Sequence, residues 1–231
     1  MPKLTMMLLM KNEERHFLRE MLDSASKYCD NFVILDDNST DNSFEIAKSY
    51  KNVEIIKKVS GESFIINESR PRYELFNLTM QTNPEYIIAL DADEILDKNG
   101  EKNIKKLLET NSVYDWFSFE FNHFWWDTKH IRMDGYWNPP KGPRMFRYDK
   151  NVNYNWRNTV LHCGSIPQDV LQKQGIYSGF RIKHYGYAKS PTEIKAKQDF
   201  YLEKDPQGKL CFMSHYLSMT DKNPVLKEWK E

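Results

Sequence analysis

Short apolar runs alternate with helix-like patterns over residues 1–110 of the chain. The runs have the length of buried strands and lie at residues 4–10, 32–35, 53–56 and 86–90. Between them, apolar residues recur at the three- and four-residue spacing of an amphipathic helix, as at Leu18, Met21, Leu22 and Ala25. Strands that alternate with helices predict an α/β domain with a mostly parallel central sheet and helices on both faces.

The pattern changes after residue 110, where aromatic side chains become frequent. Five of the six tryptophans fall between residues 116 and 156, and residues 114–126 and 144–148 have the composition of strands. The charged tail that begins at Pro191 is typical of a helix through about Leu202. Because 231 residues suit one large domain, we expect residues 1–110 and 111–231 to be two halves of the same domain.

The composition excludes some classes of protein. Lys and Arg number 33 against 33 Asp and Glu, so the formal net charge at pH 7 is zero and we expect no nucleic-acid partner. Three cysteines without paired spacing favour a reducing, cytoplasmic location. No apolar stretch reaches the ~20 residues of a membrane-spanning helix, so we expect no integral membrane segment and leave peripheral membrane contact open.

Acidic residues follow two of the predicted strands directly. Asp91 and Asp93 come after residues 86–90, and residues 36–41 form an acidic turn after residues 32–35. The carboxyl ends of parallel strands share one edge of a sheet, where ligands bind. Paired carboxylates suit Mg²⁺ or Mn²⁺, and Asp37 suits a nucleobase or ribose. The structural alternative is a pair of helix-capping turns with solvated acids.

Three motifs together resemble the inverting glycosyltransferases of family 2, which have the GT-A fold. They are Lys-Asn-Glu-Glu at 11–14, Asp-Asp-Asn-Ser-Thr-Asp at 36–41, and Asp-Ala-Asp-Glu at 91–94, in this order. The resemblance covers about residues 1–110 and implies that this half binds a nucleotide-sugar donor, while residues 111–231 bind the acceptor. It implies donor contacts from Lys11, Glu13, Asp37, Arg72, Asp91, Ala92 and Asp93.

Within that set the resemblance implies different roles. Glu13 and Asp37 match nucleoside contacts, and Asp91 matches a contact on the ribose or diphosphate side. Asp93 matches the ligand of a Mn²⁺ or Mg²⁺ cofactor. Arg72 falls where members of the family often place a basic residue near the diphosphate, although a solvated helix charge is the structural alternative.

Residues 184–187, His-Tyr-Gly-Tyr, are similar to a late motif in which a histidine completes the metal site. The resemblance makes His184 a second metal ligand beside Asp93, with a hydrogen-bonded core histidine as the structural alternative. An ordinary histidine pKa of ~6.5 then predicts that metal affinity falls between about pH 7.5 and 5.5. Lys195 and Tyr201 are further candidates for closing the site.

The catalytic base is where the sequence departs from the family pattern. Some relatives have a His-Glu pair near the position of His162-Cys163, so that acid is missing here. We select Asp134 over Asp127 and Glu120, because Asp134 lies in a loop between strand-like segments. We also expect one or two of the rings of Trp125, Trp126 and Trp137 to stack on sugar at an acceptor cleft.

These observations predict metal-dependent transfer of a sugar, with inversion, from a nucleoside-diphosphate donor to a hydroxyl of a glycan, lipid-linked or protein acceptor. Two alternatives remain. A haloacid-dehalogenase-like phosphatase also uses an Asp-x-Asp motif, but needs Thr or Val where Ile95 stands. A non-catalytic module that binds nucleotide sugars or glycans would account for the missing acid.

Overall fold

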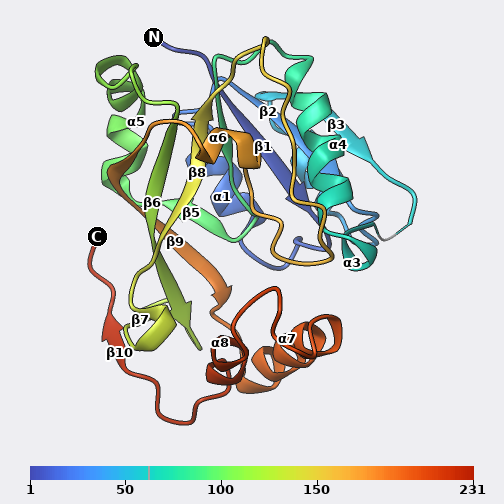
Figure 1. Ribbon diagram of the computed structural model, residues 1–231, viewed down its shortest axis with the longest axis vertical. Coiled ribbons are helices and arrows are strands. Elements are labelled where there is room, and N and C mark those ends of the chain that lie inside the picture. The colour runs from blue at the N-terminus through green and yellow to red at the C-terminus, as the bar shows by residue number, and fades with distance from the viewer. Residues whose placement is uncertain (62) are drawn as a thin grey trace.

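The computed structural model describes residues 1–61 and 63–231, and strands make up its centre (Figure 1). In chain order they are β1 Leu4–Met10, β2 Asn31–Asp36, β3 Val53–Lys58, β4 Tyr86–Ala89, β5 Glu94–Leu96, β6 Trp116–Trp125, β7 His130–Arg132, β8 Lys141–Arg147, β9 Gly175–Tyr187 and β10 Leu226–Glu228. The main path of the sheet runs β10-β7-β6-β8-β4-β1-β2-β3, and β9 pairs with both β5 and β6.

Helices cover this sheet and extend beyond it. They are α1 Leu18–Ala25, α2 Ser43–Lys48, α3 Ser63–Ile66, α4 Ser69–Met80, α5 Lys98–Thr110, α6 Gln168–Leu171, α7 Pro191–Lys204 and α8 Met213–Ser218. Residues of α1, α2 and α5 belong to one buried cluster, and residues of α4 belong to another. The prediction of helices on both faces of the sheet is therefore confirmed. None of the helices in the described ranges is long and apolar enough to cross a membrane.

The central strand β1 shows why the first half folds this way. All seven of its residues are buried, and they alternate between the two clusters, with Met6 and Leu8 on one face and Met7 and Leu9 on the other. This is the two-residue period of a strand buried on both faces. β1 pairs in parallel with β2 and with β4, and β2 pairs in parallel with β3.

This parallel pairing aligns the strand ends. Met10 stands opposite Asp36, and Met7 stands opposite Ala89. The polar turns after β1, β2 and β4 therefore lie at one edge of the sheet, as the sequence predicts.

The second half extends the sheet differently. β8 pairs antiparallel to both β4 and β6, whereas β9 runs parallel to β6. The tail helix is confirmed as α7, which begins with a capping box formed by Ser190 and Glu193. Figure 1 shows α7 and α8 at the lower end of the molecule, at about the same level as β7 and β10. Trp125, Trp137, Tyr187, Ile194 and Met219 form the small buried cluster that holds this segment.

Candidate active site

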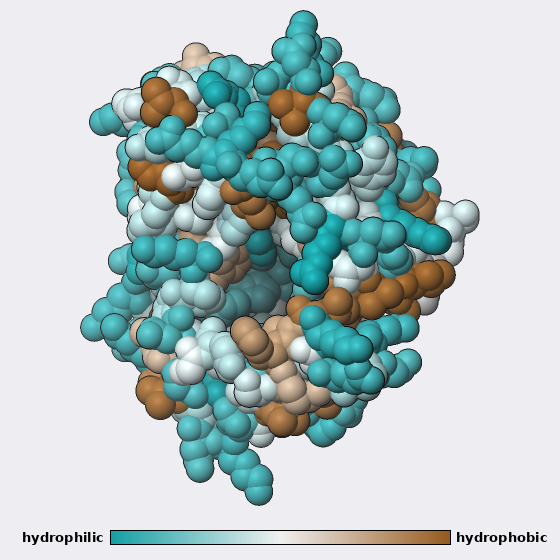
Figure 2. Space-filling view, in the orientation of Figure 1, coloured by the Kyte–Doolittle hydropathy of each residue, from teal (hydrophilic) through white to brown (hydrophobic). Residues whose placement is uncertain are grey.

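A cavity of about 640 Å³ lies where the ends of β1, β2 and β4 face α7 and α8. Figure 2 shows this hollow, with hydrophilic residues on its floor, between the body of the sheet and the segment below it. The volume is typical of a site for a small ligand. All eight donor and metal candidates from the sequence line it, namely Lys11, Glu13, Asp37, Arg72, Asp91, Ala92, Asp93 and His184.

The pairing of β5 with β9 brings Asp93 and His184 together. Glu94, the first residue of β5, stands opposite His184 in antiparallel register. The Asp93 carbonyl accepts a hydrogen bond of 2.9 Å from the Tyr185 N–H. As a result, Nε2 of His184 lies 3.7 Å from Oδ1 of Asp93.

Gly186 leaves space beside these two side chains. A Cβ atom at this position would lie 2.7 Å from Nε2 of His184 and 2.9 Å from Oδ2 of Asp93. Real Cβ atoms essentially never approach other atoms so closely. Glycine therefore keeps open a point that the imidazole and the carboxylate both face.

Two arginines pair with the other acids of the motif. The Arg72 guanidinium donates to Oδ1 of Asp91 at 3.1 Å and to Oε1 of Glu68 at 3.2 Å. Arg144 donates to both carboxylate oxygens of Glu94, at 2.9 and 2.7 Å. Such paired contacts fix the planar guanidinium in orientation as well as in position.

The two aspartates of the motif differ in acidity. Burial alone would raise the pKa of Asp91, but Arg72 and Arg144 hold it below its ordinary value. The pKa of Asp93 is raised, first by burial and then by Asp91, although Lys197 opposes the shift. A cation placed beside Asp93 would therefore relieve an unfavourable charge.

Glu13 shares this environment. Burial, and then the negative charge of Asp93, raise the pKa of Glu13 to about 7, while Lys189 opposes the rise. The backbone N–H of Glu13 donates to the hydroxyl of Ser43 at 2.7 Å, which fixes the turn after β1.

His184 remains neutral over a wide pH range. Burial, and then the positive charge of Lys197, lower the pKa of His184 to about 3. Nδ1 of His184 lies 2.6 Å from Nδ1 of His123, so one of these two nitrogens carries the shared proton. A pKa of about 3 lies below the range of pH 7.5 to 5.5 in which the sequence predicts a loss of metal affinity.

Asp37 has a structural role that the sequence did not reveal. Its side chain accepts hydrogen bonds from the N–H and hydroxyl of Ser63, at 2.9 and 2.6 Å, and from the N–H of Phe64 at 3.1 Å. Asp37 is only 1% exposed, yet it still lines the cavity. It holds the start of α3 against the end of β2.

Lys197 is a functional candidate that sequence reasoning missed. It projects from α7 into the cavity, where its ammonium lies 4.4 Å from the centre of the Tyr187 ring and donates to the Gly186 carbonyl at 3.4 Å. Lys195, the candidate from the sequence, is exposed and pairs with Asp199 along the helix. Tyr201 does line the cavity.

Asp134 is not brought to the cavity. Its carboxylate accepts hydrogen bonds of 2.7 and 2.9 Å from Arg132, and the backbone N–H of Val225 donates to it at 3.2 Å. Arg132 and, to a lesser extent, the N–H of Val225 lower the pKa of Asp134, which makes it a weak base. In the structure Asp134 is an ion-pair partner of Arg132. This position does not support the selection of Asp134 as the catalytic base.

The tryptophans selected for sugar stacking also lie elsewhere. Trp125 and Trp137 are 0% and 1% exposed and belong to the cluster that holds the C-terminal segment. The guanidinium of Arg132 lies 4.6 Å from the Trp125 ring and 5.4 Å from the Trp137 ring. Trp126 is 38% exposed, but it is not among the residues that line the cavity.

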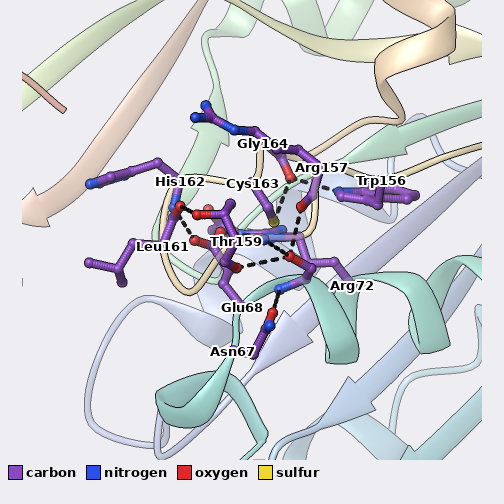
Figure 3. Close-up of polar contacts among 12 residues, drawn as sticks. Asn67, Glu68, Arg72, Trp156, Arg157, Thr159, Leu161, His162, Cys163 and Gly164 are labelled. Atoms are coloured by element: carbon purple, nitrogen blue, oxygen red, sulfur yellow. Dashed lines mark hydrogen bonds and ion pairs between the residues drawn. The ribbon is translucent and has the colours of Figure 1, made fainter. Parts of the chain in front are cut away.

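Glu68 connects the cavity to the loop that carries His162 and Cys163 (Figure 3). Its Oε2 accepts a hydrogen bond of 2.6 Å from the backbone N–H of His162, while Oε1 accepts from Arg72. The hydroxyl of Ser69, one residue further, bonds to the Arg157 and Thr159 carbonyls at 2.7 and 2.9 Å. These contacts hold an irregular loop against the start of α4.

Comparison with known proteins identifies the family. The model of the family described as "Glycosyl transferase family 2" matches residues 7–175. The chain therefore belongs to this family. It is a glycosyltransferase with the GT-A fold, which argues against the phosphatase alternative. A comparison with curated proteins gives no match.

Solved structures of S. aureus TarS share the fold. The complex of TarS 1–349 with UDP has a TM-score of 0.55 at 15% identity, over 94% of this chain and 69% of that chain. The complex with UDP-GlcNAc has a TM-score of 0.54 at 14% identity, over 94% and 70%. A longer TarS chain has a TM-score of 0.57 at 15% identity. The likeness covers 94% of this chain and 42% of that longer chain.

Proposed function

We propose that this glycosyltransferase transfers a sugar from a nucleoside-diphosphate donor to an acceptor hydroxyl, with inversion and with the help of Mn²⁺ or Mg²⁺. The observation that carries this proposal is the β5–β9 pairing, which places Asp93 and His184 side by side in the cavity at the strand ends. Carboxylate and neutral imidazole are both ligands for such metals.

The residues present fit a metal that is shared with the donor. In the parts of the chain that are described, no group of three or more His, Cys, Asp and Glu could hold an ion alone. Mg²⁺ in enzymes is commonly bound by one or two protein carboxylates together with substrate phosphates. Asp93 and His184 would hold the ion, which when bound offsets negative charge on the leaving diphosphate.

The charges in the cavity support an orientation for the donor. Arg72 and Lys197 provide positive charge near Asp91 and Asp93, and this suits the diphosphate. Glu13 and Asp37, at the ends of β1 and β2, lie where the nucleoside would bind. Since TarS binds UDP and UDP-GlcNAc, we propose a UDP-linked sugar as the first donor to test. The acceptor is a glycan, lipid-linked or protein hydroxyl.

The test measures UDP affinity by calorimetry, once with Mn²⁺ and once with a chelator. We expect the metal to tighten UDP binding at least about tenfold, and Asp93→Asn to abolish this difference, because one charged ligand is lost. Asp127→Asn is the matched control, since Asp127 is an exposed acid paired with His130. If Asp93→Asn retains the full effect of the metal, Asp93 is not a ligand.

Turnover separates an enzyme from a binding module. UDP-GlcNAc is incubated with the protein and Mn²⁺, with water as the acceptor, and the released sugar is followed by NMR before its anomers equilibrate. Inversion predicts that the first anomer has the configuration opposite to that of the donor. Binding of donors without release of UDP from any of them would favour the non-catalytic module.

A further inference from the structure

His162 has an unusual backbone conformation at the wall of the cavity. It lines the cavity and has a φ of +57°, which is uncommon for a residue other than glycine. The contact from its N–H to Glu68 helps to hold it there. In Figure 3 the imidazole points away from Glu68, so the backbone and the side chain face different groups. Strained residues that persist in a fold cluster at functional sites.

A hydrogen-bonded chain defines the protonation of this imidazole. Nε2 of His162 lies 2.8 Å from the hydroxyl of Tyr216, and that hydroxyl donates to Oδ2 of Asp205 at 3.2 Å. Because the phenolic proton points to Asp205, the phenolic oxygen accepts the proton carried by Nε2. Neutral imidazole has one N–H, so Nδ1 then carries a lone pair. No hydrogen bond from another described residue occupies that atom.

Asp205 is suited to the far end of this chain. It is 4% exposed, and its carboxylate accepts hydrogen bonds from the backbone N–H groups of Lys209, Leu210 and Cys211, at 2.8, 2.8 and 3.1 Å. Burial would raise the pKa of Asp205, but these donors hold it below its ordinary value. A buried carboxylate that stays ionised stabilises positive charge that develops on a connected histidine, as in the hydrolase triads.

Four of the acids that line the cavity are held by ion pairs or hydrogen bonds and are therefore less free to take a proton. Asp91 and Glu68 are paired with Arg72, and Glu94 is paired with Arg144. Asp37 accepts from Ser63 and Phe64. Burial lowers the pKa of His162, which favours the neutral imidazole.

We propose that His162 is the catalytic base of this enzyme. The proposal rests on the function proposed above. The acceptor oxygen forms a bond to the anomeric carbon as the bond from that carbon to the diphosphate oxygen breaks. The diphosphate leaves with the electron pair of that bond, and the acceptor proton moves to Nδ1 of His162. Tyr216 and Asp205 are positioning residues that keep the other nitrogen protonated.

The experiment follows UDP release from UDP-GlcNAc with Mn²⁺ and water as the acceptor. General-base catalysis contributes about 10²- to 10⁴-fold, so kcat of His162→Ala should fall by that factor while KM changes less than about threefold. Added imidazole should restore part of the rate, because the deleted ring leaves room for it. His162→Asn is a second variant that tolerates the positive φ and protects the test against misfolding.

The controls separate a catalytic role from a structural one. Tyr216→Phe retains the ring and should lower kcat about tenfold, as expected for one lost hydrogen bond, without rescue by imidazole. His130→Ala changes a partly exposed histidine on β7 that does not line the cavity, and it should leave kcat unchanged. UDP affinity in the presence of Mn²⁺ should be retained in all of these variants.

Three results would overturn the proposal. Turnover of His162→Ala within about threefold of the parent would remove His162 from the chemistry. A loss of turnover matched by an equal loss of UDP affinity would make it a binding residue. If the unmodified protein releases no UDP from any nucleotide sugar, the proposed function itself fails, and this result is independent of the variants.

Discussion

The two sides of the cavity are built in different ways. On the donor side, acids lie in the turns that follow the parallel strands β1, β2 and β4, so the pairing of neighbouring strands brings them to one edge. These acids are Glu13, Asp37, Asp91 and Asp93. On the opposite side, residues come from an irregular loop, from β9 and from two C-terminal helices. The match to the family ends at residue 175, which is the first residue of β9 and precedes those helices. The positions of the residues on the first side therefore follow from the pairing of neighbouring strands. The positions of the residues on the second side depend on packing between segments that are far apart in the sequence.

The two sides also differ in charge. The turn after β4 contributes two acids, one of which has a raised pKa, whereas α7 contributes Lys197. Burial would lower the pKa of Lys197, but Tyr201 and Tyr187, and after them Asp93, raise it, so the acids after β4 affect the protonation of this lysine. The C-terminal segment is therefore expected to take part in binding as well as in covering the cavity.

The largest expected effect is at the junction of the two sides. Gly186→Ala places a methyl group within 3 Å of both His184 and Asp93, and these side chains must move apart. We expect the tightening of UDP binding by Mn²⁺ to fall by about 10- to 100-fold, as for other groups that orient metal ligands. UDP affinity in the chelator should change little, which provides the internal control. An unchanged effect of Mn²⁺ would show that the two side chains do not act together.

A second prediction concerns the packing that holds the C-terminal side. Arg132→Met retains an apolar stem but loses the contacts with Trp125 and Trp137 and the 2.7 Å hydrogen bond to the Ser218 carbonyl. The free energy of unfolding in urea should fall by about 2 kcal/mol. Arg147→Met, which breaks a more exposed pair with Asp115, should cost less than about 1 kcal/mol. Equal effects of the two substitutions would contradict this account of the packing.

The contrast between the two sides also explains what the sequence could predict. The uninterrupted apolar run of β1 and the acids after β2 and β4 are local signals, and they were sufficient for the parallel sheet and for the residues at its edge. The helix at α7 was found for the same reason, because its start is marked by Ser190, Pro191 and Glu193.

Features that depend on packing could not be predicted in this way. β5 has three residues and no periodic pattern, so its pairing with β9 follows only from the folded sheet. Aromatic side chains are equally frequent in cores and in sugar sites, so Trp125 and Trp137 could not be assigned. The pairing of Asp134 with Arg132, away from the cavity, is visible only in three dimensions.

A third prediction separates the two faces of α7. Lys197→Met should weaken UDP binding by about tenfold, because it removes a positive charge from the cavity close to the acids of the metal site. Lys195→Met is the matched control on the same helix, where the lysine is exposed and pairs with Asp199. Uridine, which lacks the diphosphate, should bind both variants equally well. If uridine and UDP lose affinity equally, Lys197 does not contact the diphosphate.

The smallest expected effect is a gain in stability on the donor side. The pKa of Glu13 is about 7 in the folded protein and about 4.5 when unperturbed, so the folded state binds the proton more tightly. Stability is therefore greatest, for this group, below about pH 4.5 and is lost as the pH rises through 7. The shift sets an upper limit of about 3 kcal/mol, and solvent access and relaxation should reduce the effect to about 1 kcal/mol.

Glu13→Gln removes this dependence because the amide does not ionise. In a chelator, the variant should be more stable than the parent protein at pH 8 and equally stable at pH 4.5, as measured by urea unfolding. Glu14→Gln is the neighbouring control and should not stabilise the protein, because hydrogen bonds from Asn42 lower the pKa of Glu14. A stabilisation by Glu13→Gln that is the same at both pH values would come from packing. Only a gain confined to high pH shows that the folded protein disfavours the ionised form of Glu13, first through burial and then through the negative charge of Asp93.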